Sequence, residues 1–114
     1  MTQQTFSAQV RTEHQRVVID LHGEINAQAD QALSQAYAEA DNQNPEVIVL
    51  NFSGVDYINS TGIALIVGLL AQTRKTHRRM VVYGLSDHYV QIFQITRLSD
   101  FMDIFQDEAS ALVN

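Results

Sequence analysis

The chain has no cysteine and only one proline, Pro45. The absence of cysteine excludes disulfide bridges, thiolate zinc sites and cysteine nucleophiles. Basic residues are also few, since 7 Lys and Arg stand against 13 Asp and Glu, for a formal net charge of -6. Nucleic-acid binders carry a basic footprint, and anionic membrane surfaces attract basic patches, so this charge argues against both kinds of partner.

Long hydrophobic runs are missing as well. The opening segment, residues 1–5, is polar and lacks the apolar stretch of a secretory signal. The most apolar segment, residues 63–71, is too short to span a bilayer. We therefore expect a cytoplasmic protein with no membrane insertion. A length of 114 residues suits one domain that covers residues 1–114.

The motifs of common enzymes are absent too. None of the 5 glycines belongs to a Walker loop or a dinucleotide-binding fingerprint, and no Gly-x-Ser-x-Gly elbow occurs. The histidines do not lie at the three- or four-residue spacing of a helical ligand pair; they are His14, His22, His77 and His88. The sequence thus predicts a protein that is not an enzyme and that has no cofactor or metal site.

The first part of the sequence predicts two strands and a helix. Residues 6–10 alternate between apolar and polar, a β-branched run follows at 16–21, and polar residues 11–15 predict a hairpin-like connection. Gly23 is expected to end the second strand. Asn26 is a good N-cap for a helix, because apolar residues, mostly alanine, then recur at helical spacing.

The rest of the sequence alternates strands with helices. Residues 47–50 are an uninterrupted apolar run that suits a strand buried on both faces, and a turn is expected at 51–59. A second helix runs from Ser60 to about Thr76. The remaining predicted elements are a strand at 81–83, a helix at 87–95, a short strand near 102–105 and a terminal helix capped by Asp107.

This order of elements predicts the fold class. Strands that alternate with helices form parallel βαβ units with right-handed crossovers. We expect an α/β fold, bordering on α+β, with a mostly parallel mixed sheet of about five strands and about four helices. One or two strands at the start of the chain can pair antiparallel.

Two charged clusters are better explained by structure than by chemistry. Asp100 and Asp103 flank the last predicted strand, where polar strand ends are a simpler explanation than acid–base catalysis. Four of the seven basic residues gather at the end of the second predicted helix, where cations complement the helix dipole; they are Arg74, Lys75, Arg78 and Arg79.

A hydroxyl-bearing segment opens the second helix. Residues 57–63 (YINSTGI) follow the buried strand. Asn59 or Ser60 can cap the free amides of the first turn, which contributes about 1 kcal/mol. The serine can alternatively accept a phosphoryl group, whose charge of about -1.5 to -2 a helix N-terminus can hold without refolding of the domain. Residue types alone favour capping.

Several segments, in this order and spacing, resemble a known family. Residues 21–26 (LHGEIN) are similar to its Leu-x-Gly-x-Leu-Asp, and residues 47–55 (VIVLNFSGV) to its hydrophobic strand followed by Asp-x-Ser-x-Val. Residues 58–63 (INSTGI) are similar to its signature, Ile-Asp-Ser-Ser/Thr-Gly-Ile/Leu, and residues 90–98 and 104–112 fit its ending. The chain resembles the STAS domain family, and within it the stand-alone anti-sigma factor antagonists of bacteria.

The resemblance implies a partner-switching mechanism. Unphosphorylated, such a protein binds an anti-sigma factor that is also a serine kinase, and so frees a sigma factor for transcription. The kinase phosphorylates the signature serine, here Ser60, and the complex dissociates. A serine phosphatase resets the switch, and ATP with its metal belongs to the kinase. The protein is expected to be a monomer before it binds the kinase.

The implied binding surface combines the loop from Ser53 to Ser60 and the exposed side of the second helix, with Asn26 and neighbouring loop residues nearby. The candidate partner-contacting residues are Asn26, Ser53, Asp56, Tyr57, Asn59, Ser60, Thr61 and Gly62.

The sequence departs from the family at a few positions. Two aspartates of the family, at the start of the first helix and before the serine, are Asn26 and Asn59 here, which keep the capping ability and lose the charge. The family's Thr-Gly-Leu has Arg97 in place of glycine, and the glycine before the fourth strand is replaced around His77.

Two other functions stay open. The asparagines slightly favour a scaffold or regulatory subunit of a larger complex, of the stress-signalling or lipid-transport type, that is never phosphorylated. A small-molecule or nucleotide sensor would instead show a pocket near the helix that begins at Ser60.

Overall fold

The computed structural model describes residues 5–113. Its sheet has the strand order β1-β2-β3-β4-β5. The strands are β1 (Ser7–Glu13), β2 (Arg16–Ile25), β3 (Val47–Ile58), β4 (Arg79–Tyr83) and β5 (Asp103–Phe105). The helical segments are η1 (Ala27–Ala29), α1 (Asp30–Asn42), α2 (Ser60–Lys75), α3 (Asp87–Ile95), η2 (Leu98–Asp100) and α4 (Glu108–Val113). Strand β1 pairs antiparallel with β2 and the other pairs are parallel, which confirms the α/β expectation of a mostly parallel mixed sheet.

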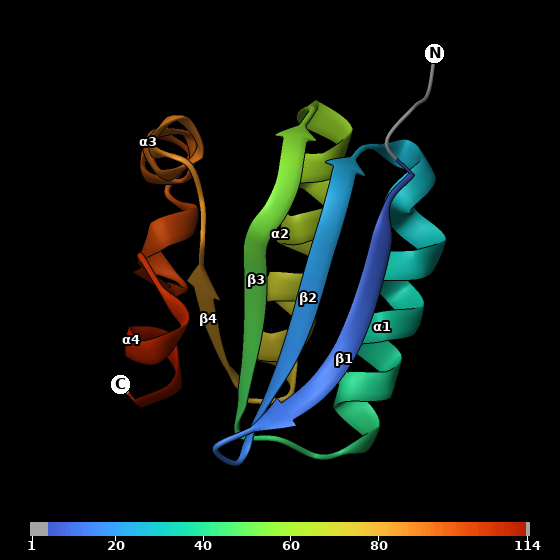
Figure 1. Ribbon diagram of the computed structural model, residues 1–114, viewed down its shortest axis with the longest axis vertical. Coiled ribbons are helices and arrows are strands. Elements are labelled where there is room, and N and C mark those ends of the chain that lie inside the picture. The colour runs from blue at the N-terminus through green and yellow to red at the C-terminus, as the bar shows by residue number, and fades with distance from the viewer. Residues whose placement is uncertain (1–4, 114) are drawn as a thin grey trace.

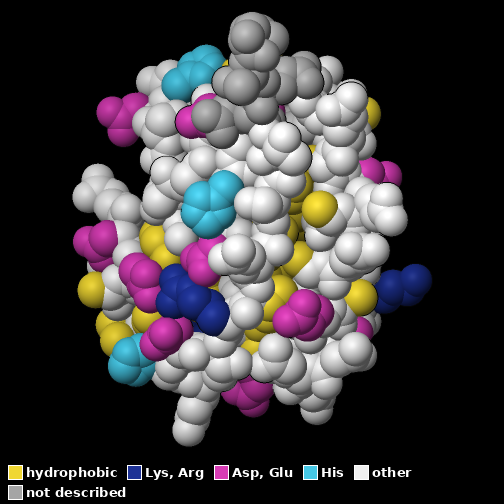
Figure 2. Space-filling view, turned by 45° about the vertical axis from the view of Figure 1, so that its right-hand side comes forward, with side chains coloured by type: hydrophobic (Ala, Val, Ile, Leu, Met, Phe, Trp, Pro, Cys, Tyr) yellow, Lys and Arg dark blue, Asp and Glu magenta, His cyan; other side chains and the backbone are white. Residues whose placement is uncertain are grey.

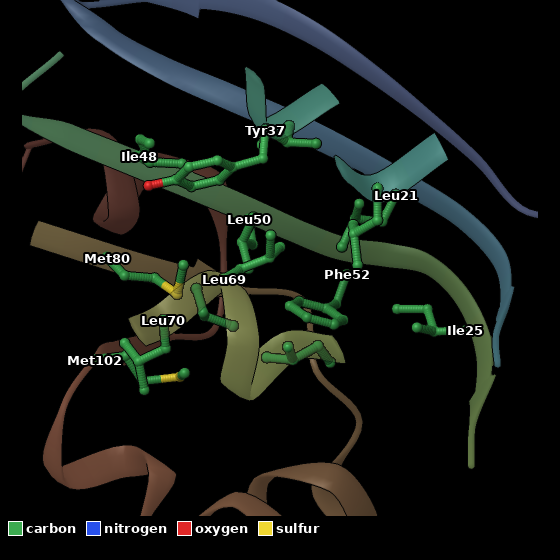
Figure 3. Packing of buried hydrophobic residues seen from close by; sticks show 14 of the residues in the cluster. Leu21, Ile25, Tyr37, Ile48, Leu50, Phe52, Leu69, Leu70, Met80 and Met102 are labelled. Carbon is green, nitrogen blue, oxygen red and sulfur yellow. The ribbon is translucent and has the colours of Figure 1, made fainter. Parts of the chain in front are cut away.

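The helices lie on both faces of the sheet (Figure 1). Helices α1 and α2 cover one face, α4 lies on the other, and α3 lies beside the end of β3. The main core fills the space under α1 and α2, where Leu21, Leu50, Phe52 and Leu69 pack together (Figure 3). Fully burying one such side chain contributes roughly 1.5–3 kcal/mol. Among the described helices, none combines the length and hydrophobicity that a bilayer crossing requires.

A second, smaller cluster lies under α4 on the opposite face. Val18, Val49 and Val81 from three neighbouring strands pack there with Ala111 and Leu112 of α4. Since Ile48, Val49 and Leu50 are all fully buried, the predicted strand at 47–50 is indeed buried on both faces.

Three strands end later in the chain than the sequence predicted. Strand β1 continues through Glu13, so the connection to β2 is only His14 and Gln15. Gly23 does not end β2: it has φ +94 and sits at a shift in the register between β2 and β3. The expected turn at 51–59 is also wrong, because those residues continue β3 to Ile58 alongside the lengthened β2. Polar residues and glycine, which looked like turn signals, mark irregularities inside a long parallel pair.

The helix ends agree more closely with the sequence. Helix α3 spans the predicted residues 87–95, and Asp107 caps α4 by accepting a hydrogen bond from the Ser110 amide at 2.9 Å. Arg97 and His77 have φ of 68° and 60°. Both non-glycine residues therefore adopt the left-handed conformation that glycine takes at the lowest cost.

Most residues of the two charged clusters interact with other residues of the domain. The Arg78 guanidinium pairs with Asp41 at 2.8 Å, and Arg74 stacks over the Phe101 ring at 4.7 Å. Asp103 pairs with Arg79 at 2.6 Å, and Asp100 pairs with Arg97 at 2.8 Å. Figure 2, which shows another face, has few basic side chains, and one of them lies against acidic ones.

A hydrogen-bonded network crosses the face of the sheet that α4 covers. Arg11 on β1 donates to Asp20 on β2 at 2.7 Å and to Glu108 on α4 at 3.0 Å. Asn51 on β3 donates to Asp20 at 2.7 Å, and the Tyr83 hydroxyl on β4 donates to Glu108 at 3.0 Å. The network therefore ties four strands to α4.

Candidate functional site

Two parallel strands end side by side and each leads into a helix. Ile25 of β2 and Ile58 of β3 are neighbours in the ladder. The residue after each is an asparagine that caps the helical segment that follows. Asn26 caps the 3-10 segment η1, which leads into α1, by accepting from the Gln28 amide at 2.9 Å, and Asn59 caps α2 by accepting from the Gly62 amide at 2.8 Å. Both predicted caps are therefore present, and Asn59 rather than Ser60 is the cap of α2.

The first turn of α2 is fixed tightly to the end of β2. The Asn59 amide donates to the Ile25 carbonyl at 3.2 Å. Gly62 is buried, and a Cβ placed on it would collide with the same Ile25 carbonyl. A glycine is thus required for the helix to start this close to the strand. Gly62, which the sequence suggested as a partner contact, packs inside the domain.

Ser60 is exposed at the first position of α2. Its hydroxyl has no hydrogen-bond partner within residues 5–113, and Asn59 performs the capping. The first turn of α2 contains no acidic residue, and the first amides of a helix lack intrahelical partners. Partial positive charge at the helix N-terminus favours an anion there. The arrangement can therefore accept and hold a phosphate on Ser60.

The candidate residues that precede Ser60 lie on β3 rather than in a loop. Asp56 and Tyr57 are exposed near the end of the strand, and the Tyr57 side chain is 53% exposed. Ser53 is exposed beside Gly84, but a strand rises about 3.3 Å per residue, so it lies on the order of 15 Å before the end of β3. The structure thus brings Asp56, Tyr57 and Thr61 near Ser60 and leaves Ser53 farther along β3.

The outward face of α2 is apolar and uncharged over most of its length. The residues exposed on it include Ala64, Val67, Gly68 and Ala71, and Val67 is 43% exposed. A Cβ added at Gly68 would meet no atom within 4 Å. No packing requirement within the described domain therefore explains a glycine in the middle of this exposed helix face.

One hollow in the described part of the chain lies away from this arrangement. A hollow of about 620 Å³ lies at the other end of the sheet, between the β1–β2 turn and the α1–β3 loop. Across residues 5–113, no group of three or more His, Asp or Glu side chains is arranged to hold a metal ion. The candidate site is thus an exposed surface around Ser60.

Sequence comparison associates the chain with one family. The family described as STAS domain matches residues 6–111. The anti-sigma-B factor antagonist of Listeria monocytogenes is 31% identical over 93 residues, which are 82% of this chain and 80% of that protein.

Solved structures share the fold. An anti-sigma factor antagonist from Mycobacterium paratuberculosis superimposes with a TM-score of 0.81 at 19% identity, covering 95% of this chain and 92% of that chain. The Bacillus cell fate determinant SpoIIAA, in its phosphorylated form, gives a TM-score of 0.69 at 23% identity and covers 91% of this chain and 96% of that chain.

Proposed function

Since the chain belongs to the STAS domain family, we propose that it is an anti-sigma factor antagonist switched by phosphorylation of Ser60. Unphosphorylated, it binds an anti-sigma factor that is also a serine kinase, and the sigma factor is released. Phosphorylation of Ser60 ends that binding. The protein itself is a non-enzymatic regulator, and the kinase supplies the ATP and the chemistry.

The free hydroxyl of Ser60 is the observation that carries this proposal. It projects from the first turn of α2, while the neighbouring Asn59 makes the capping hydrogen bond to Gly62. A modification of Ser60 therefore costs the fold no hydrogen bond. Because Asn59 is neutral, a phosphate beside it meets the positive end of the helix without repulsion from an adjacent carboxylate.

The surface around Ser60 explains how a phosphate could switch binding. The partner would dock on Tyr57, on the exposed start of α2 and on the uncharged face of α2 that continues through Val67. Desolvating a dianionic phosphate without a matching cation is costly. A phosphate on Ser60 would thus weaken docking of an apolar partner surface without any change in the fold. Because Ser60 is exposed, the phosphate would also be accessible to a serine phosphatase.

Replacing Ser60 tests the modification site. We expect the cognate anti-sigma factor kinase with Mg-ATP to transfer one phosphoryl group to the wild type and none to Ser60→Ala, as read by intact mass. Thr61→Ala is the matched control, because Thr61 is an exposed hydroxyl in the same turn, and this variant should still accept one phosphoryl group. Undiminished phosphate uptake by Ser60→Ala would disprove the assignment.

A charge at Ser60 tests the switch itself. We expect Ser60→Asp to bind the kinase more than tenfold more weakly than the wild type by calorimetry, a loss of more than about 1.4 kcal/mol. Ser60→Asn, of similar size and uncharged, is the control and should bind within a few-fold of the wild type. Equal affinities of the Asp variant and the wild type would instead favour a scaffold that docks through this surface without phosphorylation.

A further inference from the structure

Helix α3 contacts the outer part of β3 through two side chains one helical turn apart. The Phe93 ring is fully buried and meets the Phe52 ring edge to face, with centroids 6.1 Å apart. Tyr89 lies four residues earlier on the same face of α3 and is also buried. Figure 1 shows α3 beside the end of β3, beyond the end of β4.

The Tyr89 hydroxyl is hydrogen-bonded to both backbone groups of Ile58. It accepts from the Ile58 amide at 2.8 Å and donates to the Ile58 carbonyl at 3.2 Å. Strand β4 pairs with β3 only from Val47 to Asn51. Over the rest of β3, the described residues form no ladder on that side, so a single phenol satisfies the two buried groups that a strand would otherwise satisfy.

Ile58 is two residues before Ser60, and the intervening residue is held from the other side. The Asn59 amide donates to the Ile25 carbonyl of β2, and the Asn59 side chain caps α2. The junction between β3 and α2 is thus fixed by β2 on one edge and by α3 on the other. If the bond from α3 were lost, the Ile58 backbone would be unsatisfied and the start of α2 would be held on one side only.

We propose that Tyr89 is a positioning residue for Ser60: its hydroxyl anchors the end of β3 and thereby holds the serine in the geometry that the kinase binds. This inference rests on the proposed function of Ser60. It assigns to α3, which lies outside the predicted partner surface, a part in presenting the phosphorylation site.

Amide hydrogen exchange by NMR tests the anchor without any kinase. In Tyr89→Phe, exchange of the Ile58 amide should be at least tenfold faster than in the wild type, and the Asn59 and Gly62 amides should follow. Tyr37→Phe is the matched control, because Tyr37 is another buried tyrosine that lies near Ile48, at the start of β3 (Figure 3). Unchanged Ile58 exchange in Tyr89→Phe, or an equal rise in Tyr37→Phe, would overturn the proposal.

The wild type offers a second test that does not depend on the folding of a variant. A phenol proton held by a buried carbonyl exchanges slowly, so the Tyr89 hydroxyl proton should be observable at low temperature, with a nuclear Overhauser effect to the Ile58 amide. A hydroxyl proton of Tyr89 in fast exchange with water would count against the anchor.

Phosphorylation kinetics separate positioning from general destabilisation. With the cognate kinase, Tyr89→Phe should raise the KM for phosphorylation of Ser60 at least threefold and leave kcat within twofold, because fewer molecules hold the competent geometry before binding. Tyr37→Phe should change neither constant. A wild type that is not phosphorylated at all refutes the function of Ser60, whereas the exchange experiment still decides the anchoring by Tyr89.

Discussion

At the scale of single residues, Asn59 caps α2 and so leaves the Ser60 hydroxyl without a capping role. Its side-chain oxygen caps α2, its amide bonds to Ile25, and its carbonyl accepts from Ile63 at 2.9 Å. A serine at the same helix start would otherwise be the natural cap. Because the asparagine takes that position, the Ser60 hydroxyl is available for a partner or a phosphate.

We predict that Asn59→Ala lowers the free energy of unfolding by about 1 kcal/mol, because the Gly62 amide loses its acceptor. Asn59→Asp should be at least as stable as the wild type, since a carboxylate also caps and favours the helix N-terminus by roughly 0.3–1 kcal/mol. Urea denaturation followed by circular dichroism measures both. An alanine variant as stable as the wild type would show that the cap contributes nothing.

At the scale of elements, α2 combines a buried face with an exposed face that is apolar from Ala64 to Ala71. Ile66 and Leu69 pack into the core, while Val67 and Gly68 face outward. A helix in contact with solvent usually carries polar residues on its outer face. The absence of charge from this face before Arg74, together with an exposed glycine in mid-helix, fits a surface that a partner covers closely.

We predict opposite effects of Gly68→Ala on stability and on binding. The free energy of unfolding should rise by about 0.5–1 kcal/mol, because alanine is the better helix former and its Cβ meets no atom of the domain. Affinity for the anti-sigma factor kinase should fall, because the added methyl group holds the partner away. Denaturant unfolding and calorimetry measure the two effects.

Gln35→Ala, on the exposed face of α1, is the control for Gly68→Ala and should leave the affinity unchanged. An unchanged affinity in Gly68→Ala would place the middle of α2 outside the interface, without affecting the assignment of Ser60.

At the scale of the whole molecule, the network around Arg11 fastens α4 to the sheet. Burial acts to raise the pKa of Asp20, but the hydrogen bonds from Arg11 and Asn51 outweigh it and hold that pKa below its usual value. The hydrogen bond from Arg11 likewise lowers the pKa of Glu108. Burial, together with the hydrogen bond to Glu108, raises the pKa of Tyr83 to about 12.

The lowered carboxyl pKa values predict a loss of stability in acid. Groups whose pKa is depressed on folding stabilise the protein above their unfolded pKa, here about 4, and this stabilisation is lost as the pH falls through the folded values. The free energy of unfolding should therefore fall from pH 5 to pH 3, and the fall should be shallower in Arg11→Met.

Urea denaturation at several pH values measures that slope. Arg97→Met is the matched control, because it removes the same charge from a highly exposed pair with Asp100; its slope should stay close to that of the wild type. Parallel slopes in the wild type and Arg11→Met would rule out the network as the source of the acid sensitivity.

Local patterns in the sequence determined the element types, the asparagine caps and the family signature around Ser60. Apolar spacing and capping are properties of neighbouring residues, so α3 and the caps at Asn26, Asn59 and Asp107 could be predicted. Only the tertiary structure decided the length of β3 and the burial of Gly62, because a long parallel pair with β2 overrides local turn signals. It alone brought Tyr89 to Ile58, a contact between residues 31 positions apart that no local pattern records.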